Sequence, residues 1–157
     1  DNYTAQGLYT RYGFQKVGTT WHYYIPYDSL KPLGQFSCET IRPEEIDFVG
    51  EKYRTSLPPT QIRRFLEHGE SLVFTLKDSQ NNVVGVCRFT PSFPGCFPFE
   101  IDHVDLVDDF ISCIKSHALP EYDYIRLTFT DNPELAQLCE ERGYRLHHRL
   151  FKMGLKL

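Results

Sequence analysis

A segment at the start of the chain recurs near its end, and this repeat constrains the fold more than any other feature of the sequence. At a constant offset of 130, residues 1–14 (DNYTAQGLYTRYGF) align without a gap with residues 131–144 (DNPELAQLCEERGY). Both segments run directly into a strand-like stretch. The repeat indicates either two copies of one helix–strand unit or helix-cap residues that both segments share. Four positions are identical: Asp1 and Asp131, Asn2 and Asn132, Leu8 and Leu138, and Gly13 and Gly143.

The hydrophobic pattern predicts a mixed α/β sheet domain from residue 35 onward. The expected order is strand, two helices, three strands, helix, strand, helix and strand. Antiparallel neighbours followed by a late strand–helix–strand crossover predict a mainly antiparallel sheet with one parallel pair. The strongest helical pattern spans 105–118, where apolar residues repeat at i, i+3, i+4 and i+7: Val107, Phe110, Ile111 and Ile114.

The segment before residue 35 predicts a separate helix and strand. Residues 1–14 have a helical pattern that ends at Gly13, and residues 15–25 are rich in Val, Thr, Trp and Tyr. Two prolines and a glycine in the next nine residues mark a connection. We therefore expect residues 1–30 to be the tail of a preceding domain and residues 31–157 to form a second domain. A lone helix and strand are unstable, so this tail should dock on the second domain, pair with a sheet edge or swap into a second copy.

Composition and charge restrict the partners. The net charge of -4 argues against nucleic acid, and no apolar stretch is long enough to cross a bilayer. The start of the chain lacks a signal-peptide pattern. The five cysteines lack metal-binding spacing, so we expect reduced thiols in a cytoplasmic protein. His147 and His148 are consecutive on a strand and should point to opposite faces, so no metal site is expected.

The first copy of the repeat resembles a known family. The pattern N-x-x-A-x-x-L-Y-x-x-x-G-F, followed by a strand that carries Tyr-Tyr, is similar to the late helix and strand of the GNAT superfamily of acyl-CoA-dependent N-acetyltransferases. The order of elements from residue 35 resembles the whole GNAT fold, and ETIRPEEID (39–47) resembles its first strand and helix. The residues of the pattern are Asn2, Ala5, Leu8, Tyr9, Gly13 and Phe14, followed by Tyr23 and Tyr24.

The resemblance implies a site and a reaction. In that family one strand splays from its neighbour, and the pantetheine arm of acetyl-CoA pairs with the exposed backbone. The pyrophosphate binds backbone N–H groups of a glycine-containing loop at the start of the central helix. The resemblance assigns Asn2 to cofactor binding and Tyr9 to catalysis, as the acid that protonates the leaving thiolate. The equivalent residues of the second copy are Asn132 and Cys139.

The second copy departs from the family pattern at the start of its central helix. Residues 100–110 (EIDHVDLVDDF) contain no glycine, lysine or arginine. The structural interpretation is a self-capped helix whose acidic residues complement its own dipole; the alternatives are an unusual cofactor loop or a site for another ligand. Cys139 also stands where the family often has Tyr. Acetyl-CoA binding by residues 31–157 is therefore expected to be weak or absent.

Two functions follow. In the first, the intact protein transfers an acyl group from acyl-CoA to a small amine or a protein amine, and this chain contributes mainly a degenerate C-terminal domain. In the second, residues 31–157 are a non-catalytic module that caps or shapes a partner domain. A glycine-rich cofactor loop upstream of residue 1 would favour the first function, and its absence would favour the second.

Overall fold

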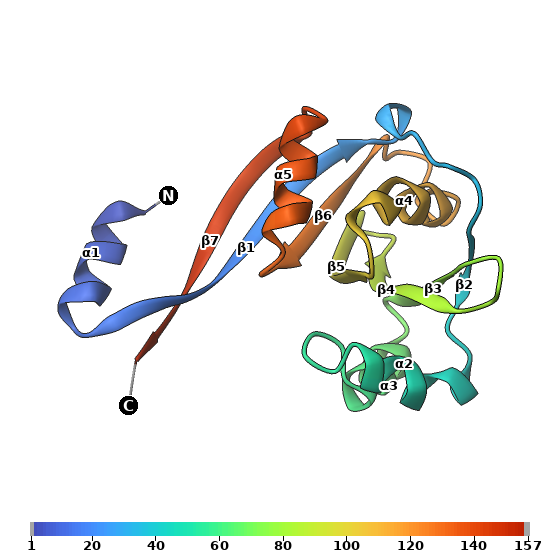
Figure 1. Cartoon of the computed structure of the whole chain (residues 1–157), viewed down its shortest axis with the longest axis horizontal. Coiled ribbons are helices and arrows are strands. Elements are labelled where there is room, and N and C mark those ends of the chain that lie inside the picture. The colour runs from blue at the N-terminus through green and yellow to red at the C-terminus, as the bar shows by residue number, and fades with distance from the viewer. Residues whose placement is uncertain (1, 156–157) are drawn as a thin grey trace.

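The computed structural model describes residues 2–155, which contain a seven-stranded mixed sheet in the order β2-β3-β4-β5-β6-β1-β7 (Figure 1). All neighbours are antiparallel except β5 and β6. The strands are β1 (Phe14–Pro26), β2 (Ser37–Thr40), β3 (Leu72–Lys77), β4 (Val83–Thr90), β5 (Gly95–Ile101), β6 (Tyr124–Thr130) and β7 (Arg145–Leu155). The helices are α1 (Tyr3–Arg11), α2 (Ile46–Lys52), α3 (Pro59–His68), α4 (Val107–Lys115) and α5 (Pro133–Glu141), with 3-10 turns η1 (Tyr27–Ser29), η2 (Pro43–Glu45) and η3 (Val104–Leu106).

Helices cover both faces of the sheet because neighbouring strand residues point to opposite sides. On one face Phe74 packs in a core with residues of α4 and α5, while Val73 packs on the other face with residues of α2 and α3. The four residues of the predicted 105–118 stripe are all fully buried. The expected mixed sheet, with its late parallel pair and a helix packed across one face, is confirmed.

Strand β1 lies inside the sheet. Its second half (Thr20–Pro26) pairs with β6, and most of its length pairs with β7 on the other side. Tyr23 and Ile25 are buried in the main core, and the Tyr23 hydroxyl donates to the carbonyl of Ala136 in α5 (3.3 Å). The expectation that this segment docks on the rest of the chain is confirmed, and it does so between two strands instead of at a sheet edge.

The first half of β1 pairs only with β7 among the described residues, and together they form a two-stranded arm that carries α1 (Figure 1). Helix α1 has no buried residue. The side chains of Leu8, Tyr9 and Tyr12, which repeat at helical spacing, stay exposed because α1 contacts little beyond β1. Asp1, the first residue of the repeat, lies outside the described residues.

A disulfide joins Cys38 of β2 to Cys113 of α4. The expectation of five reduced thiols is therefore wrong for this pair, although Cys87, Cys96 and Cys139 are free and buried. The two cysteines are 75 residues apart, and their contact depends on how α4 crosses the sheet. Disulfides persist in oxidising compartments, so the cysteines give no support to a cytoplasmic location. Within residues 2–155, no helix is long and apolar enough to cross a membrane.

A buried lysine ties β3 to the segment before α2. Lys77 is 1% exposed, and its ammonium binds the carboxylates of Glu39 and Glu45. Glu45 also accepts hydrogen bonds from the side chain (2.9 Å) and backbone (3.0 Å) of Arg42. Arg42, and then Lys77, lower the pKa of Glu45 from 4.5 to about 2. The carboxylate therefore stabilises the folded state more than the unfolded state.

We expect acid to destabilise the protein in part through Glu45. Because its folded pKa is depressed, its contribution is complete above pH 4.5 and is lost as the pH falls towards about 2. Denaturant unfolding at steps between pH 7 and pH 2.5 measures this loss. The variant Glu45→Gln should show a flatter decline below pH 4.5, whereas Glu44→Gln should behave as the wild type because the Glu44 side chain is 66% exposed. Equal slopes for Glu45→Gln and the wild type would contradict the assignment.

Candidate functional site

Strands β5 and β6 separate soon after they begin. Their parallel ladder consists, in the described chain, of two residue pairs: Gly95 with Arg126 and Cys96 with Leu127. Directly after this point β5 contains a cis Phe97–Pro98 peptide bond, and its register with β4 shifts. A register shift bends a strand away from its neighbour. The later parts of β5 and β6 do not pair with each other.

A cavity of about 320 Å³ lies where the two strands diverge, and we call it the β5–β6 opening. Phe97–Glu100 and Phe129–Asp131 form its sides, and Thr55 and Ser56 of the α2–α3 connection also line it. Burial raises the pKa of Glu100, whose carboxylate accepts a hydrogen bond from Ser56. Unpaired strand edges beside a half-buried cavity can bind an extended chain that carries amide groups.

The acidic residues at the start of α4 do not face this opening as free carboxylates. Asp108 is 1% exposed and accepts hydrogen bonds from the Lys31 backbone N–H (2.9 Å) and the Tyr144 hydroxyl (2.9 Å). It also pairs with Arg142 (2.6 Å). Asp109 accepts a hydrogen bond from the Gly34 backbone N–H (2.9 Å). These two carboxylates hold the segment that connects β1 to β2.

The expectation of a self-capped helix is wrong about the cap, because Leu106 is the N-cap of α4 and no side chain caps it. Asp108 and Asp109 do lie in the first turn, where they complement the helix dipole as expected. Asp102 forms an ion pair with Lys52 (2.6 Å) and accepts a hydrogen bond from the Tyr53 hydroxyl (2.8 Å). Burial, and then Asp102, raise the pKa of Tyr53. Asp102 and Asp108 are thus paired with basic side chains, and Asp109 accepts a hydrogen bond from the backbone.

The packing at the start of α4 also hinders the approach of a phosphate to the backbone. Val104, Leu106 and Val107 pack into the same apolar core as Leu135 and Ala136 at the start of α5. No glycine lies between residues 96 and 142, so no position there lets a phosphate approach the backbone without a Cβ. This steric argument adds to the lack of lysine and arginine in residues 100–110, and weak acetyl-CoA binding stays a prediction.

The residues of the second copy of the repeat have structural roles. The Asn132 side chain caps α5 by accepting a hydrogen bond from the Leu135 backbone N–H (3.0 Å). Cys139 is fully buried, and burial raises the pKa of its thiol to about 12. A buried thiol of this kind is a poor acid for a leaving group at the surface.

The predicted site residues of the first copy lie on α1, at the end of the arm that points away from α4 (Figure 1). Asn2 caps α1 by accepting a hydrogen bond from the Ala5 backbone N–H (3.0 Å). Tyr9 is 47% exposed, and its ring packs edge to face on Phe14, with 5.7 Å between centroids. Neither residue lines the β5–β6 opening. The fold therefore does not bring Asn2 and Tyr9 together with that opening.

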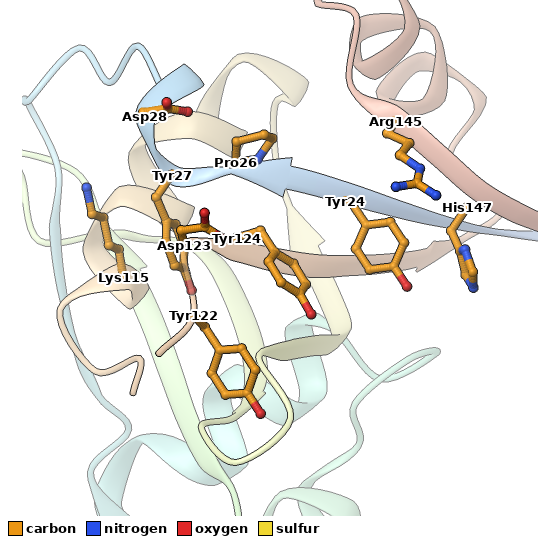
Figure 2. A pocket seen from close by; sticks show the side chains of 10 residues that line it. All are labelled: Tyr24, Pro26, Tyr27, Asp28, Lys115, Tyr122, Asp123, Tyr124, Arg145 and His147. Carbon is orange, nitrogen blue, oxygen red and sulfur yellow. The ribbon is translucent and has the colours of Figure 1, made fainter. Parts of the chain in front are cut away.

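A large groove of about 750 Å³ lies where β1 ends and β6 begins, and Figure 2 shows its ten lining side chains. We call it the aromatic groove. Tyr122, Tyr124 and Tyr24 form a series of edge-to-face pairs, with 6.1 and 5.4 Å between successive centroids. His147 extends the series (4.9 Å from the Tyr24 ring). Such rings provide a flat apolar surface with polar rims.

A smaller cavity of about 230 Å³ adjoins this groove, because Tyr24 and His147 line both. We call it the arginine pocket. Arg88 of β4 and Arg126 of β6 line it. His147 and His148 both line it too, with 4.5 Å between their rings, so the expectation of opposite faces is wrong. The register of β7 against β1 shifts between these positions, which breaks the alternation.

Sequence reasoning missed the arginine pocket. Arg88 and Arg126 are 38 residues apart on different strands, and no local pattern marks them. Among the described residues, no group of three or more histidine, cysteine, aspartate or glutamate side chains has the geometry of a metal site.

Solved structures with a similar fold include proteins named as GCN5-related N-acetyltransferases and a protein of unknown function. A GCN5-related N-acetyltransferase from Anabaena variabilis superposes with a TM-score of 0.64 at 17% identity, over 94% of this chain and 42% of that protein. A GCN5-related N-acetyltransferase from Sphaerobacter thermophilus superposes with a TM-score of 0.61 at 15% identity, over 99% of this chain and 59% of that protein. A conserved protein of unknown function from Staphylococcus epidermidis superposes with a TM-score of 0.67 at 10% identity, over 98% of this chain and 66% of that protein. No protein-family model and no curated protein matches the sequence.

The chain therefore has the fold of the GCN5-related N-acetyltransferases, as the resemblance of its elements predicted. It spans less than two thirds of the length of the three structures compared. At 10–17% identity the similarity establishes the fold and leaves the activity to be argued from the site.

Proposed function

We propose that this chain is the C-terminal domain of an N-acyltransferase that transfers an acyl group from acyl-CoA to an amine. The β5–β6 opening carries this proposal, because two unpaired strand edges flank a cavity that can take an acyl-pantetheine arm. An amine held beside the thioester carbonyl needs mainly orientation and the removal of one proton. The acceptor is a small amine or a protein amine.

We further propose that a preceding domain of the same fold lies upstream and supplies the main cofactor site. The repeat supports this, because α1 and β1 follow the same helix–strand pattern as α5 and β7. The exposed apolar residues of the arm, such as Tyr3 and Leu8, would be covered by that domain. Asn2 would then bind the cofactor and Tyr9 would protonate the leaving thiolate there. A swapped arrangement with a second copy through residues 15–25 is the other way to cover the arm.

A non-catalytic role for residues 31–157 is the second candidate. The apolar packing at the start of α4 and the buried Cys139 favour it, since both remove features that the family uses. The domain would then shape a partner domain or hold an acceptor at their interface. A cytoplasmic location fits either role only if Cys38 and Cys113 are reduced in the cell.

We expect residues 1–157 to bind acetyl-CoA and S-acetylpantetheine with similar, weak affinity, with Kd values on the order of 1 mM. The reason is that the start of α4 offers the phosphates neither a close backbone approach nor a positive side chain. Calorimetry at low salt compares the two ligands. Amide NMR shifts should change at Phe97, Phe99, Glu100 and Phe129–Asp131 and stay constant in α3.

Two other results would change the proposal. Acetyl-CoA binding about 100-fold tighter than S-acetylpantetheine would mean that a pyrophosphate site exists, and the degenerate interpretation would be wrong. No binding of either ligand would remove the opening as a cofactor site and favour the non-catalytic role. The same titration on a protein that includes an upstream domain would then test whether that domain binds the cofactor.

A further inference from the structure

Two arginine side chains in the arginine pocket lack an anionic partner. Arg88 and Arg126 line the cavity from different strands, and neither forms an ion pair within the described residues. The Nε atoms of both are buried and find no hydrogen-bond partner in that part of the chain. Buried charged donors are normally paired, so their absence of partners points to a ligand.

Aromatic rings hold both guanidinium groups in place. The Arg126 guanidinium carbon lies 4.2 Å from the centroid of Phe93 and 5.5 Å from that of Tyr24. The Arg88 guanidinium carbon lies 4.4 Å from the centroid of Phe65. Stacking on a ring restricts the side chain and leaves the N–H groups at the edge free to donate.

The rest of the pocket contributes no negative charge. Among the described residues that line it, none is acidic, and the polar groups include His22, Thr128 and His148. His22 shares a hydrogen bond with the Thr128 hydroxyl (2.9 Å), and its ring lies 4.2 Å from that of His148. Burial, and then His148, lower the pKa of His22. The positive charge of the pocket therefore comes mainly from the two arginines near neutral pH.

We propose that the arginine pocket binds the carboxylate of a small organic ligand. Carboxylates accept paired hydrogen bonds from the planar fork of arginine, and the cavity of about 230 Å³ suits a small molecule. Phe97 lines both this pocket and the β5–β6 opening, so a bound carboxylate lies one side chain away from that opening. This inference rests on the proposed function, and it identifies the acceptor as an amine that also bears a carboxylate, as an amino acid does.

The test uses two probes of nearly the same size, N-acetylalanine with a carboxylate and N-acetylalaninamide with a neutral carboxamide, titrated into residues 1–157 without acyl-CoA. NMR shifts of the His22 and His148 rings report on the pocket. N-acetylalanine should bind at least about 10-fold more tightly than the neutral amide, because only the former has a carboxylate. Arg88→Gln and Arg126→Gln should each weaken it about 10-fold or more. Arg54→Gln is the matched control, since the Arg54 side chain is 75% exposed in the α2–α3 connection.

Circular dichroism on each variant checks its folding, and Arg88→Lys and Arg126→Lys keep the charge without the planar fork. Intermediate affinity of the lysine variants supports the arginine geometry. Equal affinity for the two probes, or no loss of affinity in folded Gln variants, overturns the inference. Acetyl-CoA binding is measured separately, so a failure here leaves the proposed function standing. Binding of N-acetylalanine without any acetyl-CoA binding would leave a carboxylate site without the acyltransferase role.

Discussion

Removal of residues 1–30 is expected to abolish cooperative folding of the remaining chain. The deletion takes β1 out of the interior of the sheet, so β6 and β7 both lose their partner. It also removes Tyr23, Ile25 and Tyr27 from the core, each of which contributes about 1.5–3 kcal/mol through burial. Small domains have total free energies of unfolding of about 5–15 kcal/mol, so this loss is comparable with the total stability of the domain.

Deletion of residues 1–11 is the matched control. It removes α1, which has no buried residue, and we expect the free energy of unfolding to change by less than about 1 kcal/mol. Circular dichroism and urea unfolding on both deletions measure the difference. If residues 31–157 unfold cooperatively at the wild-type temperature and with the same oligomeric state, β1 is dispensable, and β7 must then pair with β6 directly.

Loss of the Cys38–Cys113 disulfide is expected to lower the free energy of unfolding by about 4–5 kcal/mol. The disulfide closes a loop of 75 residues, and restricting the unfolded chain over that length accounts for an effect of this size. The melting temperature should fall by roughly 10 °C, as measured for Cys38→Ser/Cys113→Ser. Reductant should destabilise the wild type to a similar extent and leave the double variant unchanged.

Thiol titration in denaturant gives an independent check. Without reductant, three thiols should react: Cys87, Cys96 and Cys139. Five reactive thiols in freshly purified protein would show that Cys38 and Cys113 are reduced, and the expectation of a cytoplasmic thiol protein would regain its basis.

Local patterns predicted the elements well. The second of the two helices expected after the first strand is α3, because Pro59 begins it and Gly69, at φ 69°, ends it. The stripe that begins at Val107 predicted which face of α4 is buried, since four apolar side chains at helical spacing must leave water together. The strand expected at 15–25 is β1, extended by one residue at each end.

The candidate site could not be predicted in the same way. The consecutive positions of His147 and His148 suggested opposite faces, and a shift of register in β7 overruled the alternation. The acidic residues at 100–110 suggested a helix that caps itself, but Asp108 and Asp109 are buried against a segment about 75 residues earlier in the chain. Neither the register shift nor the burial of these carboxylates can be predicted from the residues next to them in the sequence.

The sequence by itself determined the order of helices and strands, the mixed α/β class and the repeat, because these depend on spacing, capping residues and side-chain alternation. Only the tertiary structure decided that β1 lies between β6 and β7, that Cys38 meets Cys113, and that Arg88 and Arg126 line one pocket. Each of these depends on segments distant in the chain being brought together by sheet pairing and core packing. The spacing of residues along the chain does not predict such contacts.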